Sequence, residues 1–310
     1  MSRPLVLVTC RQMQNELPQH LERIETLGYE VVAPELGGRQ QFTAAELLEY
    51  SPRLVGIIAG DDQLDRDFFE RAAQLKTVIR WGIGMDSVDH EAARLHGVSV
   101  RNTPGVFGQE VADAAFGYIL NLARGYVAVD AGVRRGEWPK WEGLTLSGKR
   151  LGIVGFGAIG HEIARRGAGF NMDVVTFDPY VEKAPAGVTT VDLDTLLSTS
   201  RFIVLACPLT PETFHLINTD RLNRMRSDAY LVNVARGPVI READLIEALT
   251  SGRLAGAALD VFEVEPLPLE SALRTLPNVV LGAHNGSNTR EGVARASKVA
   301  VDALLEELAK

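Results

Sequence analysis

The segment 150–160, which reads RLGIVGFGAIG, constrains the fold of this chain more than any other. Its apolar part, 151–154, is typical of a buried parallel strand, and a helical pattern follows the glycines. Gly155 suits a sharp turn out of the strand, Gly157 the close approach of a pyrophosphate, and Gly160 tight packing of helix on strand. The N–H groups at the start of such a helix attract phosphate. The segment therefore predicts a dinucleotide-binding unit.

The acid that follows this unit indicates which dinucleotide is bound. A second apolar run, 174–177, ends at Asp178, 18 residues after Gly160. A carboxylate at about this distance meets the hydroxyls of the adenosine ribose. Because a carboxylate there would repel a 2′-phosphate, the sequence predicts NAD rather than NADP. A structural turn followed by a surface acid is the alternative, but it does not explain why strand, glycines, helix, strand and acid occur in this order.

Length, charge and cysteine content narrow the class of protein. A chain of 310 residues is expected to form roughly two domains. Its net charge of −8 argues against nucleic acid or an anionic membrane as a partner. Two cysteines without metal-ligand spacing predict neither a disulfide framework nor a metal site, and no apolar run reaches membrane-spanning length. We expect a cytoplasmic protein.

Strand-like and helix-like patterns alternate through both halves of the chain, which predicts two parallel α/β sheets. The residues around 16–27 have a helical pattern, and residues 289–308 form a long amphipathic one. The segment 102–105, with Pro104 and Gly105, marks a crossing between domains. The helical pattern 111–124 is apolar over more than one face, so it is either buried between domains or packed on a second subunit.

The loop 80–89 in the first half has two interpretations of equal weight. Gly82 and Gly84 stand between a strand and a helix, and the backbone N–H groups of such a turn can hold an anion. The loop could equally be an ordinary connection, with Asp86 or Asp89 capping the next helix.

Polar residues in the second half follow the ends of the predicted strands. Ligands of an open parallel sheet bind at the carboxyl ends of its strands. The residues expected at this edge are the three glycines, Asp178, Cys207 and Pro208, Ala235 and Arg236, Asp260, Glu265, and His284.

Three of these residues suit hydride transfer to or from a carbon that bears oxygen. A histidine such as His284 can exchange the proton, and a carboxylate such as Glu265 can orient it. Arg236 can polarise a carbonyl group and bind an adjacent carboxylate. Taken singly, each has an ordinary alternative: a surface histidine, a turn before Pro266, a solvated arginine. Together, beside a nucleotide motif, they predict a dehydrogenase acting on a small anionic 2-hydroxy or 2-keto acid.

These motifs resemble those of the D-2-hydroxyacid dehydrogenase family along nearly the whole chain. The matching segments are 81–86 (WGIGMD), 102–104 (NTP), 154–160 (VGFGAIG), 177–180 (FDPY), 207–210 (CPLT), 233–237 (NVARG), 259–266 (LDVFEVEP) and His284.

The resemblance implies two doubly wound parallel-sheet domains. A Rossmann NAD-binding domain, 103–284, would be inserted in a flavodoxin-like substrate domain, 1–102 and 285–310. It implies a homodimer built on helices of the cofactor domain. The resemblance assigns catalysis to Arg236, Glu265 and His284. It assigns substrate binding to Arg236, to His284 and to the N–H groups of Ile83 and Gly84. The implied cofactor contacts are Val111, Gly155, Gly157, Ala158, Ile159, Gly160, Asp178, Cys207, Pro208, Thr213, Ala235, Arg236, Asp260, His284 and Gly286.

The substrate is less well defined than the family. Arg80 stands where phosphoglycerate dehydrogenases carry an arginine near the substrate phosphate, which implies D-3-phosphoglycerate. Asn285, after the histidine, departs from the apolar residue of many members and leaves hydroxypyruvate or glyoxylate reduction open. An NAD-sensing regulatory protein is the alternative from another class, and the complete set of Arg236, Glu265 and His284 argues against it.

Overall fold

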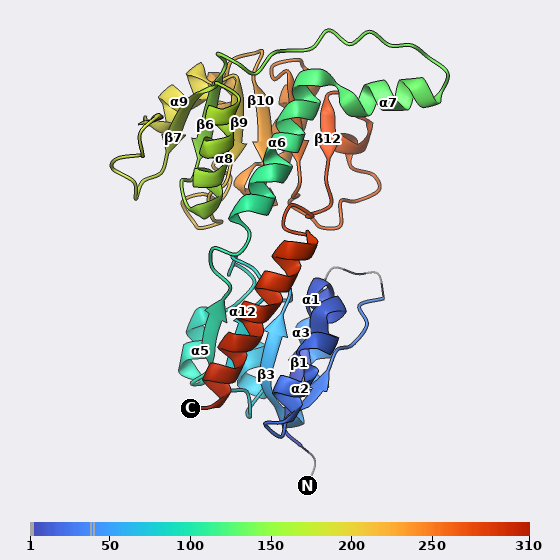
Figure 1. Ribbon diagram of the computed structural model, residues 1–310, viewed down its shortest axis with the longest axis vertical. Helices are drawn as coiled ribbons and strands as arrows, with labels where there is room; N and C mark the ends of the chain where they lie inside the picture. Colours follow the sequence, from blue (N-terminus) through green and yellow to red (C-terminus); the bar gives the residue numbers. More distant parts are fainter. Residues whose placement is uncertain (1–2, 38, 40) are drawn as a thin grey trace. The chain divides into compact units, whose positions relative to one another are not determined.

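The computed structural model describes residues 3–37, 39 and 41–310. The chain divides into two compact units, Met1–Phe107 with Asn288–Lys310, and Gly108–Ser287. Each unit has its own parallel sheet with helices packed against it (Figure 1). The predicted fold class, two doubly wound parallel-sheet domains, is confirmed.

The first unit contains a five-stranded sheet in the order β2-β1-β3-β4-β5. This order, 2-1-3-4-5, is that of flavodoxin-like folds, in which ligands bind at the carboxyl ends of the strands. The central strands β1, β3 and β4 are fully buried and rich in Val, Ile and Leu, as expected where both faces of the sheet are covered. The strands of the sheet are β1 (Leu5–Val8), β2 (Glu30–Val32), β3 (Leu54–Ala59), β4 (Thr77–Arg80) and β5 (Ser99–Asn102).

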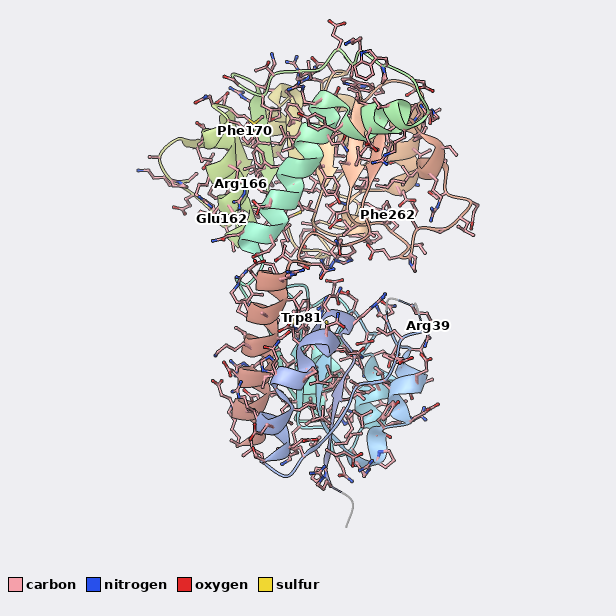
Figure 2. All side chains as sticks on the ribbon, turned by 45° about the vertical axis from the view of Figure 1, so that its right-hand side comes forward. Arg39, Trp81, Glu162, Arg166, Phe170 and Phe262 are labelled. Atoms are coloured by element: carbon pink, nitrogen blue, oxygen red, sulfur yellow. The ribbon has the colours of Figure 1, made fainter. Side chains whose placement is uncertain are left out.

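The helices of the first unit come from both ends of the chain. The long helix predicted near the C-terminus is present as α12, which begins after the capping residue Thr289 and packs on β3 and β4. Gly56 allows this packing, since a Cβ there would lie 2.9 Å from Leu304 Cδ1. Trp81 (Figure 2) donates from Nε1 to Ser297 of the same helix, at 3.1 Å. The helices are α1 (Arg11–Glu16), α2 (Leu21–Glu25), α3 (Ala44–Leu48), α4 (Arg66–Arg71), α5 (His90–Leu95) and α12 (Arg290–Leu308).

The predicted helix around residues 16–27 is interrupted. Helix α1 ends at Glu16, a 3₁₀ turn covers Leu17–Gln19, and α2 begins at Leu21. Pro18 at the start of the turn explains the break, because proline has no N–H to donate to the preceding helical turn.

The second unit contains a seven-stranded parallel sheet in the order β12-β11-β10-β9-β6-β7-β8. If β6 is counted as the first strand, the first six strands have the Rossmann order 3-2-1-4-5-6, and β12 adds a seventh strand at one edge. The direction of the strand order reverses between β6 and β9. The short edge strand β8 was not predicted, because its three residues are largely exposed and form no apolar run. The strands are β6 (Arg150–Val154), β7 (Asp173–Phe177), β8 (Val188–Thr190), β9 (Phe202–Leu205), β10 (Tyr230–Asn233), β11 (Gly256–Leu259) and β12 (Val279–Leu281).

Helix α6 packs against α8 and against strands of its own unit, so its broad apolar surface is buried there. Arg166 of α8 forms ion pairs with Asp113 of α6 and with Glu162, each at 2.6 Å. Figure 2 labels Glu162 and Arg166 of α8 and Phe170, which follows α8 and stacks on Phe116 of α6. The helices of this unit are α6 (Gly108–Arg124), α7 (Tyr126–Arg134), α8 (Ala158–Gly169), α9 (Leu193–Thr199), α10 (Thr219–Arg224) and α11 (Glu242–Thr250).

A membrane-spanning helix is not found within 3–37, 39 and 41–310, since none of the helices there combines the necessary length and apolar character.

Candidate active site

The glycine turn between β6 and α8 has the shape that its spacing predicts. Gly155 has φ +92°, and a Cβ there would lie 2.6 Å from the backbone nitrogen of Cys207. A Cβ on Gly160 would overlap the carbonyl oxygen of Gly155. Gly157, by contrast, has no atom within 4 Å of the position where its Cβ would stand. The first and third glycines are required by packing, whereas the middle one leaves open space above the turn.

This open space fits the pyrophosphate of NAD. Gly157 is the N-cap of α8 and has no side chain to accept the first N–H groups of the helix. Ala158 and Ile159 form the first turn, where backbone N–H groups and the helix dipole favour an anion. The unit therefore offers N–H donors without a covering side chain at the point where the strand order reverses.

Asp178 is connected to the same turn by hydrogen bonds. Its Oδ2 accepts from the N–H of Phe156 at 2.7 Å, and its Oδ1 accepts from the N–H of Tyr180 at 2.9 Å. A carboxylate has about four acceptor positions, so it can still accept from ribose hydroxyls. The acid thus both orders the glycine turn and places a negative charge where the sequence predicted it.

The other predicted cofactor residues of this unit lie on the same edge of the sheet or beside it. Cys207 and Pro208 follow β9, and the Pro208 carbonyl accepts from Thr213 Oγ1 at 2.6 Å. Val111 of α6 adjoins Gly286, since a Cβ on that glycine would lie 3.8 Å from Val111 Cγ2. Contact of these residues with NAD remains a prediction.

His284 and Glu265 form a close pair. Nδ1 of the histidine lies 2.7 Å from Oε2 of Glu265, and each side chain is 23% exposed. Oε1 of the same carboxylate accepts from the N–H of Phe262 at 3.0 Å. Both carboxylate oxygens are therefore engaged, and the imidazole is held through one ring nitrogen.

Arg236 lies in the loop after β10, and Asn233 shapes this loop. Asn233, 1% exposed, donates from Nδ2 to the Arg236 carbonyl at 2.9 Å and accepts from the Ala235 N–H at 3.0 Å. A Cβ on Gly237 would overlap the backbone of Phe262, which Figure 2 labels. The arginine loop therefore packs against the loop that carries Glu265. Asn233 was not predicted, although its position at the strand end is the signal that could have identified it.

Asp260 organises the residues around His284. It is 3% exposed and accepts from the backbone N–H groups of Asn285, at 3.2 Å, and Gly286, at 2.9 Å. Its Oδ1 also accepts from the hydroxyl of Tyr118, at 2.7 Å. No motif in the sequence singles out this tyrosine. The tyrosine lies on α6, far from Asp260 in the sequence, and only the packing of the second unit brings the two side chains together.

The predicted substrate-binding residues Arg80, Ile83 and Gly84 belong to the first unit. Ile83 is exposed, and its carbonyl accepts from Asn102 Nδ2 at 2.8 Å. Asp89 caps α5 by accepting from the N–H of Ala92, as one of the two interpretations of this loop predicts.

Arg80 is almost enclosed in the first unit, with 5% of the residue exposed. Its Nη2 forms an ion pair with Asp61, and its Nη1 donates to the carbonyl of Trp81. The guanidinium stands beside the predicted loop, yet a carboxylate of the same unit already compensates its charge.

Comparison with known proteins places this site in a family. The model of the "D-isomer specific 2-hydroxyacid dehydrogenase, NAD binding domain" matches residues 116–286. A glyoxylate reductase of Thermococcus onnurineus is 39% identical over 309 residues, covering 94% of this chain and 90% of that protein. A D-3-phosphoglycerate dehydrogenase of Methanocaldococcus jannaschii is 38% identical over 273 residues, covering 86% of this chain and 52% of that protein.

A solved structure extends the similarity to the fold. The NAD-dependent formate dehydrogenase from Staphylococcus aureus, in complex with NAD, has a TM-score of 0.89 and 30% identity, covering 99% of this chain and 96% of that one. This similarity, together with the Rossmann strand order of the second unit, defines an NAD-binding oxidoreductase. The chain belongs to the D-isomer-specific 2-hydroxyacid dehydrogenase family, and it is an NAD-dependent enzyme of that family.

Proposed function

We propose that this enzyme interconverts a small unphosphorylated 2-keto acid, of the glyoxylate or hydroxypyruvate class, and its D-2-hydroxy acid. The observation that carries this substrate class is the ion pair of Arg80 and Asp61. It favours the reductase alternative over D-3-phosphoglycerate. The name of the Thermococcus onnurineus relative agrees with this choice.

A phosphate-binding arginine needs a charge that is available to the ligand. A phosphate monoester carries about −1.5 to −2 charges at neutral pH. Arg80 shares its charge with Asp61, whose side chain is 33% exposed, so an approaching phosphate also meets a carboxylate. A compact neutral group such as a hydrogen or a hydroxymethyl meets no such repulsion.

The proposed chemistry assigns one role to each residue of the catalytic set. Bound NAD supplies the acceptor or, when reduced, the donor of the hydride. His284, held through Nδ1 by Glu265, exchanges the proton with the substrate oxygen through Nε2. Arg236 polarises the carbonyl and binds the substrate carboxylate. In the first unit, the N–H groups of Ile83 and Gly84 are a proposed binding site for a substrate carboxylate.

The negative Glu265 also explains how the histidine can accept its proton. A carboxylate beside an imidazole stabilises the imidazolium form and fixes which nitrogen faces the reaction. Because Glu265 is itself fixed by the Phe262 N–H, the pair needs little rearrangement during turnover.

We further propose a homodimer formed through α7 and the loop after it. Figure 1 shows α7 extending away from the sheet of its own unit. Tyr126 and Val127 of α7, and Trp138 and Trp141 of the loop, are exposed, and Trp138 is 76% accessible. Four large exposed side chains on one helix and the loop that follows it support a protein contact at this surface. Light scattering should give twice the mass of the chain and a smaller mass for Trp138→Glu; a monomeric wild type would contradict the proposal.

The substrate proposal is tested by NADH oxidation with glyoxylate, hydroxypyruvate and 3-phosphohydroxypyruvate, and by NAD reduction with D- and L-glycerate. We expect kcat/KM for hydroxypyruvate to exceed that for its phosphorylated form at least about tenfold, a difference of about 1.4 kcal/mol. Only D-glycerate should be oxidised. Preference for the phosphorylated acid would restore the phosphoglycerate assignment. NADH binding without turnover of any of these acids would refute the proposed substrate class.

A further inference from the structure

Asp260 binds three consecutive residues of the segment that carries the proposed catalytic histidine. Its backbone carbonyl accepts from the His284 N–H at 2.7 Å. Its two carboxylate oxygens accept from the N–H groups of Asn285 and Gly286. His284 itself has φ +51°, a conformation that non-glycine residues adopt at some cost. The position of the imidazole therefore depends on how firmly Asp260 holds this segment.

Tyr118 completes the environment of that carboxylate. Its hydroxyl donates to Asp260 Oδ1 at 2.7 Å, shorter than the 3.2 Å bond to the same oxygen from Asn285 N. We infer that Tyr118 is a positioning residue for the reaction, acting on His284 through Asp260. It thereby connects α6 to the catalytic histidine.

The backbone before and after His284 packs closely against the side chains of Tyr118 and Asp260. A Cβ on Gly282 would overlap the hydroxyl of Tyr118 and Oδ1 of Asp260. A Cβ on Gly286 would stand 2.9 Å from Oδ2 of the same carboxylate. The segment 282–286 is therefore in contact with the tyrosine–aspartate pair before and after His284. A small rotation of the carboxylate would displace this segment.

The chemistry of the pair explains why the hydroxyl matters. A buried carboxylate is costly unless donors satisfy it, and bonds to a charged acceptor are the stronger ones. Burial and then the negative charge of Asp260 raise the pKa of Tyr118, so the hydroxyl keeps its proton and remains a donor. Without it, Oδ1 would retain the longer bond from Asn285.

The role of Tyr118 rests on the proposed function of His284, so the experiment varies both residues. Tyr118→Phe keeps the ring on α6 and removes only the hydroxyl. We expect kcat with hydroxypyruvate to fall about tenfold, while the KM for NADH and the KM for the keto acid change less than about twofold. Tyr230→Phe is the matched control, because its ring stacks on Phe202 in the same unit at the start of β10. Its kcat should remain that of the wild type.

A double-mutant cycle separates positioning from a general structural effect. In a His284→Ala background, Tyr118→Phe should change the residual turnover by less than about twofold, because the residue that it positions is gone. Equal loss in both backgrounds, or an unchanged kcat in Tyr118→Phe with only a lower Tm, would overturn the inference. If His284→Ala itself retains full turnover, the proposed function of the histidine fails as well, and this single variant identifies that outcome.

Discussion

Oε2 of Glu265 lies 2.7 Å from Nδ1 of His284, although 19 positions separate the two residues in the chain. The pairing follows from the sheet. Glu265 comes shortly after β11, His284 follows β12, and these strands are parallel neighbours. A second histidine–carboxylate pair lies in the same unit, with Nε2 of His215 2.8 Å from Oε1 of Glu263. The chain therefore offers a matched histidine–carboxylate pair against which the proposed catalytic pair can be tested.

The middle glycine of the turn should matter for NAD and not for folding. Because Gly157 has open space around it and a negative φ, Gly157→Ala should fold with a Tm close to that of the wild type. Its Cβ would nevertheless occupy the path of the pyrophosphate, so we expect the Kd for NADH, measured by fluorescence, to rise about tenfold or more. Gly169→Ala, at the other end of α8 and equally open, is the control. Unchanged NADH affinity in Gly157→Ala would refute the assignment of this turn.

Asp178 should determine the choice of dinucleotide. Asp178→Ala removes the charge that repels a 2′-phosphate, so the ratio of kcat/KM for NADH to that for NADPH should fall about tenfold or more. NADH affinity should fall too, because the carboxylate also accepts from Phe156 and Tyr180. Asp173→Ala is the control: it removes an acid from the start of β7, whereas Asp178 follows the end of that strand. It should leave the ratio unchanged. A wild type that already prefers NADPH would show that Asp178 has been misassigned.

Asp61 should keep phosphorylated substrates out. Asp61→Asn removes the negative charge that compensates Arg80, so kcat/KM for 3-phosphohydroxypyruvate should rise about tenfold while that for hydroxypyruvate changes little. Asp67→Asn, on the surface of α4 where it pairs with Arg71, serves as the control for loss of one acid. A variant that gains nothing with the phosphorylated acid would separate Arg80 from substrate selection.

Both cysteines should resist alkylation in the folded protein. Burial raises the pKa of Cys10 to about 12 and, with the charge of Asp178 as a smaller cause, that of Cys207 to about 11. The reactive thiolate is therefore roughly one part in a thousand or less at pH 8, and its share increases as the pH rises toward these values. Mass spectrometry after iodoacetamide treatment should show two modifications in denaturant and almost none in buffer. Rapid labelling of the native chain at pH 8 would contradict this.

Local patterns were sufficient to predict most of the fold. Continuous apolar runs predicted the central strands, and glycine spacing with Asp178 predicted the cofactor turn. The short strand β8 was not predicted, because an edge strand needs no apolar run. One predicted helix is interrupted in the structure at Pro18. Fold class and family are confirmed, whereas the roles of individual site residues remain predictions.

What the sequence could not provide is the partner of each polar side chain. Tyr118 and Asp260 are 142 positions apart, and Asp61 and Arg80 are 19 apart, so no local pattern connects them. A tyrosine on a helix is usually a packing residue, and an arginine before a loop is indistinguishable in sequence from one that binds phosphate. The tertiary structure shows the first as a donor to a buried carboxylate and the second as already paired.

The most direct test of the central claim is the turnover number of His284→Ala in NADH oxidation with hydroxypyruvate, measured beside its Kd for NADH. His215→Ala, from the second histidine–carboxylate pair, is the control. We predict that His284→Ala loses roughly a hundredfold or more in kcat, because the proton-transfer step loses its acid–base group. Its NADH affinity should be largely kept, because the glycine turn and Asp178 are unchanged. His215→Ala should turn over like the wild type. Full turnover by His284→Ala would contradict the assignment of this histidine and, with it, the proposed mechanism.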